Sequence, residues 1–175
     1  MTIYVIIVLA ILVIWIISNY NFFVSSKTRI KASIQEIGNQ LKRQAELIPN
    51  LESSVKGYLS HEKGILEMLT DARKLISTGK DASAKIAELL PKLQIVVESN
   101  PELKGNTVVI SLMDELRDTA DKVMYARRLL IDLTADFNVK RVTFPSSLVA
   151  GLFKISEEEG LKISEAETKT PRISL

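Results

Sequence analysis

The fold is decided by IYVIIVLAILVIWII, residues 3–17, a run of fifteen apolar residues near the amino terminus. It lies within residues 1–26, which carry no charged side chain. A helix extended through Val24 reaches roughly 36 Å at about 1.5 Å per residue, and the hydrocarbon core of a bilayer is about 30 Å thick. Length and composition therefore predict a transmembrane helix.

Aromatic and basic residues follow this run directly. They are Tyr20, Phe22, Phe23, Lys27, Arg29 and Lys31. Aromatic rings favour the membrane interface, and Lys and Arg accumulate on the cytoplasmic side. Because no basic residue precedes the run, we expect the amino terminus outside the cell membrane and the rest of the chain in the cytoplasm.

A cleaved secretory signal peptide is the main alternative to an anchor. Such a peptide has a basic segment before its apolar run and small residues at its cleavage site. This chain shows no basic segment there, and Ser18, Asn19 and Tyr20 do not form the small-x-small pattern. Residues 1–26 are therefore interpreted as an uncleaved, single-pass anchor with its interface.

The body, residues 27–155, is long enough for one domain with its own core. The chain has a net charge of +2 with acidic and basic residues interspersed. It therefore has no basic stripe of the kind that binds nucleic acid, and nucleic acid is not expected as a partner. The absence of cysteine excludes disulfides and cysteine-based metal sites, and it fits a reducing compartment.

Apolar spacing predicts that the anchor continues as the first helix of the body. The stripe is Ile30, Ile34, Ile37, Leu41, Ala45 and Ile48. Residues three and four apart share a helix face. The first helix is expected to end at Leu47, because the residue before Pro49 is pushed out of the helical region.

Three further helices are expected in the body. The second begins near Pro49, and its apolar stripe includes Glu62. The third begins at Asp81 and contains Pro91, where a kink or a break is expected because proline removes a backbone hydrogen bond. The fourth is the longest, from about Thr107 to Arg141, and residues 143–145 end it.

The end of the chain is predicted to be simpler. Residues 146–155 are expected to form a short apolar helix that closes the bundle, or alternatively dips toward the lipid surface. The polar residues 156–175 are expected to be a disordered tail. The predicted fold class is all-α: a single N-terminal transmembrane helix continuing into a long antiparallel bundle of about four main helices.

No catalytic, cofactor-binding or metal site is recognised. His61 is the only histidine, and a zinc site would need further histidines or cysteines at helical spacing. The sequence has no G-x-S-x-G elbow, and its seven scattered glycines build no phosphate loop. We therefore expect a protein that is not an enzyme.

One polar pairing is predicted within the bundle. Glu62 lies in the apolar stripe of the second helix, and Arg127 and Arg128 lie on the fourth. A partly buried ion pair between them would favour one helix register more than it would stabilise the fold. The alternative interpretation is that Glu62 faces solvent.

Several motifs resemble those of the LemA family. They are QLKRQAELIPNL at residues 40–51, VKGY at 55–58, His61-Glu62, NPELK at 100–104, ARR at 126–128, FN at 137–138 and FP at 144–145. The resemblance covers nearly the whole chain. The sequence differs from the family pattern at Ser33, Gly38, Asn100 and residues 130–131, which puts any shared ligand site there in doubt.

The resemblance implies a bacterial-type single-pass membrane protein with a cytoplasmic helical bundle, and it implies no reaction. The matching residues carried over as structural or partner-binding candidates are Arg43, Pro49, Asn50, Tyr58, His61, Glu62, Arg127 and Arg128. Among these, Arg43 and Asn50 could present a polar patch to a partner. Other membrane or envelope proteins are the expected partners, a membrane protease among them.

The function expected from these observations is that of a membrane-tethered scaffold or adaptor. Its long helices with heptad-like apolar seams also make a homo-oligomer plausible. The alternative is a membrane-tethered sensor that transmits a ligand or partner signal along the first helix. No cofactor is expected in either case.

Overall fold

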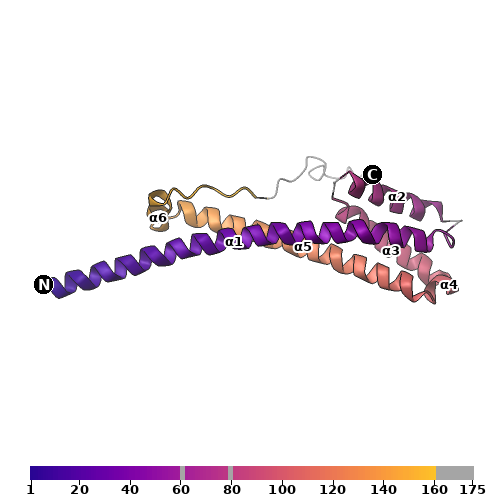
Figure 1. The fold of residues 1–175 in the computed structure, drawn as a ribbon, viewed down its shortest axis with the longest axis horizontal. Helices are drawn as coiled ribbons and strands as arrows, with labels where there is room; N and C mark the ends of the chain where they lie inside the picture. Colours follow the sequence, from indigo (N-terminus) through magenta and orange to yellow (C-terminus); the bar gives the residue numbers. More distant parts are fainter. Residues whose placement is uncertain (60–61, 79–80, 161–175) are drawn as a thin grey trace, which may run out of the picture. The chain divides into compact units, whose positions relative to one another are not determined.

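The computed structural model describes residues 1–59, 62–78 and 81–160 (Figure 1). Within these residues the chain forms helices and no strand, so the predicted all-α class is confirmed. The helices are α1 (Thr2–Val55), α2 (Lys63–Ser77), α3 (Ser83–Ser99), α4 (Pro101–Lys104), α5 (Thr107–Val142) and α6 (Ser146–Leu152). His61 and residues 161–175 of the predicted tail lie outside the described residues.

The chain divides into two compact units. Residues 34–126 form one, and residues 1–33 together with 127–175 form the other. The helices α1 and α5 each contribute a segment to both units. We call the first the bundle unit and the second the anchor unit, and each is described by itself.

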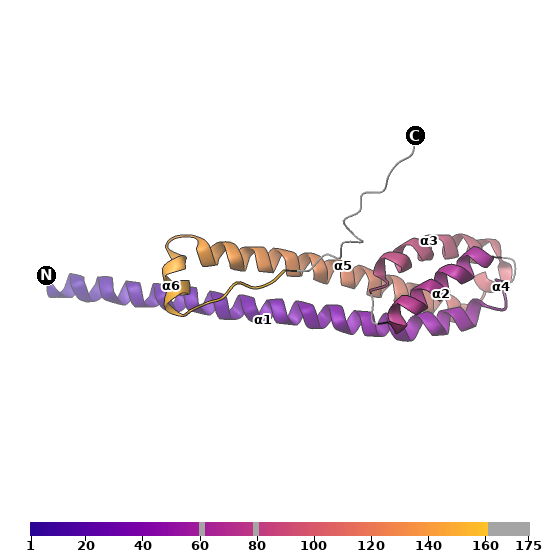
Figure 2. The ribbon, with the colours of Figure 1, turned by 90° about the horizontal axis from the view of Figure 1, so that it is seen from above.

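The bundle unit has a closely packed apolar core. In it, the antiparallel segments of α1 and α5 run beside the shorter α2, α3 and α4 (Figure 2). The side chains with no exposed surface include Ile48, Leu51, Val55, Leu69, Ile86, Leu89, Leu93, Leu103 and Leu116. In α1 and α3 these residues recur at three- and four-residue spacing, so each of these two helices turns one apolar face inward.

The predicted end of the first helix at Pro49 is wrong. The helix α1 continues through Pro49 to Val55, and α2 begins only at Lys63. A proline inside a helix costs about 3 kcal/mol, whereas burying an aliphatic side chain contributes about 1.5–3 kcal/mol. Because Ile48 and Leu51 flank the proline and are fully buried, their packing outweighs its cost.

Pro91 does not break its helix either, since α3 is continuous from Ser83 to Ser99. Pro91 is exposed, while Leu90 and Leu93 on the inner face are buried. The same balance of packing against a missing hydrogen bond therefore holds in α3. The predicted fourth helix is confirmed as α5, Thr107–Val142.

The short helix α4 was not predicted from the spacing of apolar residues, and an asparagine cap explains why it forms. The side-chain oxygen of Asn100 accepts hydrogen bonds from the backbone N–H groups of Glu102 and Leu103, at 3.0 and 3.3 Å, and Pro101 occupies the first turn of α4. Asn106 caps α5 in the same way, through Val108 and Val109. An N-terminal cap satisfies backbone donors that have no partner inside the helix.

The anchor unit is held together by aromatic and aliphatic packing. The rings of Phe23 on α1 and Phe137 on α5 lie 5.4 Å apart in an edge-on arrangement. The predicted short helix is present as α6, and its Val149 and Ala150 are buried. Residues 156–160 form no helix, yet Glu158 is bound to Asn138 and to Lys27.

The amino-terminal part of α1 is long and apolar enough to cross a membrane by length and composition. Its side chains are almost all exposed, as Ile3 (71%) and Ile14 (66%) illustrate. A core helix of a globular domain would bury most of such side chains. The first seventeen residues therefore contribute little to the core of the anchor unit.

Candidate functional site

A polar groove lies between α1 and α5 in the bundle unit. It has a volume of about 420 Å³ and is lined by Asn39, Lys42, Arg43, Glu46, Leu47, Asn50 and Glu115. Six of these side chains are polar or charged, and six of the seven come from α1. We call this feature the α1–α5 groove.

The spacing of the groove residues follows from helix geometry. Asn39, Arg43, Glu46 and Asn50 succeed one another at steps of four, three and four residues. Residues at these steps lie on one face of a helix. The uninterrupted helix through Pro49 therefore aligns Asn50 with Arg43, which the predicted helix end at Leu47 would not have done.

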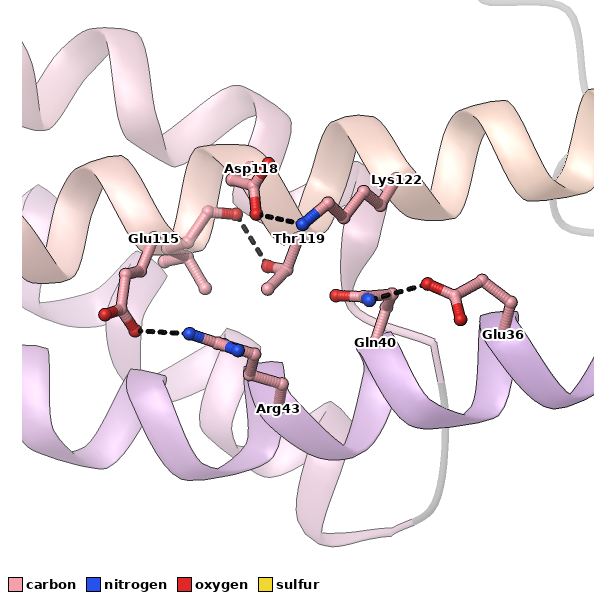
Figure 3. A network of polar contacts seen from close by, with 8 residues as sticks. Glu36, Gln40, Arg43, Glu115, Asp118, Thr119 and Lys122 are labelled. Atoms are coloured by element: carbon pink, nitrogen blue, oxygen red, sulfur yellow. Dashed lines mark hydrogen bonds and ion pairs between the residues drawn. The ribbon is translucent and has the colours of Figure 1, made fainter.

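An ion pair closes one side of the groove. The guanidinium Nη2 of Arg43 lies 3.2 Å from the Glu115 carboxylate, and the two side chains are 56% and 44% exposed (Figure 3). Pairs this exposed typically contribute about 0–1 kcal/mol, because water screens the charges and both side chains lose rotamer freedom. The pair therefore orients Arg43 more than it stabilises the bundle.

A polar layer lies on the inner face of α1 beside the groove. Gln44 is fully buried, and neither its amide nitrogen nor its amide oxygen has a hydrogen-bond partner within the described residues. Figure 3 shows Gln40 of α1 and Thr119 of α5 pointing into the space between these helices. Gln40 donates to Glu36 at 2.7 Å, and Thr119 donates to the Leu116 carbonyl at 2.8 Å.

This layer corrects the predicted stripe of the first helix. Ile34, which was expected to be buried, is 52% exposed, whereas Gln44 is 0% exposed. Counted backward from the buried Ile48, Leu51 and Val55, helical spacing leads to Gln44 and then to Gln40. That periodicity was the available signal for Gln44, which was not among the predicted candidates.

A second depression lies over α3, α4 and α5 in the same unit. It has a volume of about 440 Å³ and is lined by Gln94, Val97, Glu98, Lys104, Ile110, Met113, Asp114 and Arg117. Arg117 pairs with Asp114 at 3.0 Å and contacts the Gln94 side chain at 3.4 Å. The Arg117 guanidinium is thus already bound by residues of the bundle unit. The lining of this second depression is also more apolar than that of the α1–α5 groove.

The structure brings together two of the predicted candidates, Arg43 and Asn50, in one groove. Pro49 lies inside α1, where its carbonyl accepts a hydrogen bond from Ser53 at 2.8 Å. Tyr58 is exposed on the turn after α1. Arg127, half-buried, and Arg128, exposed, lie on the α5 segment of the anchor unit.

Glu62 does not occupy a buried position. It is exposed and is the residue that precedes α2, where its side chain makes no capping hydrogen bond. The helix begins fourteen residues later than predicted, at Lys63 instead of Pro49, so the stripe that placed Glu62 inward was misassigned. Its pairing with Arg127 or Arg128 stays a prediction.

The groove offers recognition chemistry. It presents one arginine, one lysine, two carboxylates and two carboxamides, which can donate and accept hydrogen bonds to a polar or charged partner. Among the described residues, no three His, Cys, Asp or Glu side chains gather into a group that could hold a metal ion. Among the predicted candidates that the structure describes, Arg43 and Asn50 line this groove and the others do not.

Comparison with known proteins assigns the chain to a family. No curated protein matches it. The model of the LemA family matches residues 33–175. The match spans the whole bundle unit and continues through the rest of α5 and through α6, so the chain belongs to the LemA family.

Proposed function

We propose that this protein is a membrane-anchored helical scaffold or adaptor that binds other proteins at the cytoplasmic face of the membrane through its α1–α5 groove. The observation that carries the proposal is the convergence of Arg43, Asn50 and Glu115 on one groove. Arg43 and Asn50 belong to the sequence signature that marks the family, and both are exposed.

The anchoring half of the proposal rests on the exposed apolar surface of residues 3–17. Such a surface is unfavourable in water and favourable in hydrocarbon. The basic residues Lys27, Arg29 and Lys31 that follow it favour a cytoplasmic location for everything after the span. The amino terminus then lies outside.

The binding half rests on the weakness of the Arg43–Glu115 pair. Because this exposed pair contributes little, a carboxylate of a partner can replace Glu115 at low free-energy cost. Arginine is also enriched among the residues that dominate binding energy at interfaces. The partner expected is therefore a protein segment with acidic or carboxamide side chains, from another membrane or envelope protein, a membrane protease included, or from a second copy of this chain.

Site-specific crosslinking in cells tests the proposal. A photoreactive residue at Asn50 in the full-length chain is expected to give a reproducible adduct, which Arg43→Glu abolishes. The matched control places the same residue at Thr70, which is exposed on α2 away from the groove lining. Adducts of equal yield at both positions, or an adduct at Asn50 that Arg43→Glu leaves intact, would contradict the groove as the binding site.

A sensor function is the second candidate, and one observation favours it. The single helix α1, Thr2–Val55, carries both the apolar run and six of the groove residues. Binding at Arg43 could therefore alter the same helix near its membrane-proximal segment. Amide hydrogen exchange of residues 18–33 that is unchanged by a bound partner would count against this function.

A further inference from the structure

We propose that α6 and the residues beside it form a second membrane contact, which lies in the lipid interface of the bilayer that α1 crosses. This inference rests on the proposed membrane anchoring. It concerns a surface defined by Phe144, Leu148, Leu152 and Phe153, which we call the α6 patch. All four side chains belong to the anchor unit.

The α6 patch consists of exposed apolar side chains on α6 and on the residues that flank it. Inward, Val149 and Ala150 are buried. Outward, Phe144, Leu148, Leu152 and Phe153 are 76, 62, 69 and 46% exposed. A helix that faces water on one side normally carries polar residues there, so an apolar outer side indicates a further apolar environment.

The position of α6 along α1 indicates that lipid covers the α6 patch. The rings of Phe153 and Tyr20 are 4.7 Å apart, and both views of the ribbon show α6 beside α1 (Figures 1 and 2). Tyr20 comes three residues after the apolar run, about 4.5 Å along the helix axis. The α6 patch therefore continues the apolar surface of the span at the depth where that span ends.

The surrounding side chains suit a headgroup region. The ammonium group of Lys140 lies 4.0 Å from the centre of the Phe22 ring, an arrangement that keeps an apolar stem and a charged tip at the interface. Of the three glutamates at residues 157–159, which follow α6, Glu157 pairs with Arg141 at 3.0 Å and Glu158 with Lys27 at 2.7 Å. Repulsion from anionic lipids is thereby reduced.

Tryptophan fluorescence in vesicles tests this contact, because Trp15 is the only tryptophan and lies in the apolar run. The full chain is reconstituted into phosphatidylcholine–phosphatidylglycerol vesicles that contain lipids with quenchers at defined depths. Native Trp15 reports on the anchor. A Trp15→Phe, Leu152→Trp variant reports on α6, and Trp15→Phe, Leu148→Trp provides a second reporter one turn away.

The expected result is quenching of the tryptophans at positions 152 and 148 by shallow quenchers, and of Trp15 by quenchers placed deeper than those. Trp15→Phe, Asp132→Trp is the matched control, because Asp132 is exposed on α5 in the same unit, and its tryptophan should remain unquenched. Replacing Phe144 by Asp in the Leu152→Trp background should reduce quenching at 152 at least twofold and leave the helix content unchanged.

Each alternative outcome overturns the proposal in a distinguishable way. A quenched Trp15 with unquenched reporters at 152 and 148 leaves the anchor intact and refutes the α6 contact. A blue-shifted but unquenched reporter at 152 assigns the patch to protein, either a second copy or a partner. An unquenched Trp15 refutes the anchoring itself, and with it the second contact.

Discussion

Asn138 holds the backbone of Glu158 by two hydrogen bonds. Its side-chain nitrogen donates to the Glu158 carbonyl at 2.9 Å, and its side-chain oxygen accepts from the Glu158 N–H at 3.1 Å. A carboxamide can bind both the backbone N–H and the backbone C=O of one residue because it offers a donor and an acceptor together. The asparagine of the FN motif at residues 137–138 thus fixes the segment that leaves α6.

Replacing Asn138 by Ala should release residues 156–160 from α5. Two hydrogen bonds of ordinary strength contribute about 1–3 kcal/mol together, so the loss is local and does not unfold the anchor unit. Amide hydrogen exchange at Glu158 should accelerate at least fivefold, whereas Asn21→Ala, an exposed asparagine of the same unit, should leave it unchanged. Unaltered exchange in Asn138→Ala would show that the ion pair with Lys27 suffices.

The sequence predicted element type well and element ends poorly. Apolar spacing correctly indicated α5 and the short α6, because a repeat sustained along a helix is a strong signal. The end expected at Pro49 was wrong, and of the kink or break expected at Pro91 the continuous α3 excludes the break, because core packing outweighs the local effect of proline. Ile48 belongs to a core built from several helices, and the stability of that core cannot be estimated from the few residues around Pro49.

Arg43 and Glu115 should show little energetic coupling in the isolated protein. Both side chains are exposed, so a double-mutant cycle with Arg43→Ala and Glu115→Ala should give an interaction free energy below about 1 kcal/mol. Thermal unfolding followed by circular dichroism measures it. A coupling above 2 kcal/mol would indicate a structural pair and would weaken the case for exchange with a partner's carboxylate.

Gln44→Leu should stabilise the bundle unit. The amide of Gln44 is fully buried with both polar atoms unpartnered among the described residues, and an unpaired buried polar group typically costs about 1–3 kcal/mol. Leucine is similar in size and has no such requirement. The midpoint of thermal unfolding should rise, whereas Gln35→Leu, at an exposed glutamine of α1 in the same unit, should change stability by less than about 0.5 kcal/mol.

A lower midpoint for Gln44→Leu would mean that Gln44 is paired in solution, by water or by a partner. Buried polar residues can also fix helix register at a cost in stability. In that case Gln44→Leu would keep its stability gain but lose a unique packing arrangement, visible as broadened side-chain NMR signals.

Only part of the α1–α5 groove was predicted from the sequence. Arg43 and Asn50 could be proposed because both lie in the family signature, but their meeting with Glu115 depends on how α1 packs against α5, which links positions 72 residues apart. Gln44 was missed because a polar side chain is normally assigned to the exposed face of a helix, although its spacing from Ile48 places it on the buried face. Glu62 was wrongly placed on a buried face, because the apolar stripe that included it combines residues of α1 and α2.

Pro49→Ala should raise the stability of the bundle unit. Alanine restores a backbone donor for the Ala45 carbonyl and removes the proline ring from the interior of α1. The expected gain is about 1–3 kcal/mol, reduced by the greater freedom that alanine gives the unfolded chain. Pro91→Ala in α3 provides an independent replicate. A loss of stability in both variants would show that these helices need the shape that proline imposes.

Glu88 should titrate below the ordinary range of a glutamate. Its pKa is lowered by the hydrogen bond from Lys92, then by the positive charges of Lys92 and Lys85, and Lys92 lies 2.8 Å away. Because the pKa is lower in the folded state, the pair stabilises α3 above the unfolded pKa, and this contribution is lost as the pH falls through the folded pKa. Lys92→Gln should raise the Glu88 pKa in an NMR titration. Lys122→Gln on α5 is the control, because it removes a lysine that pairs with Asp118 at the same four-residue spacing, and it should leave the Glu88 pKa unchanged. An identical Glu88 titration in native protein and in Lys92→Gln would show that water screens the pair completely.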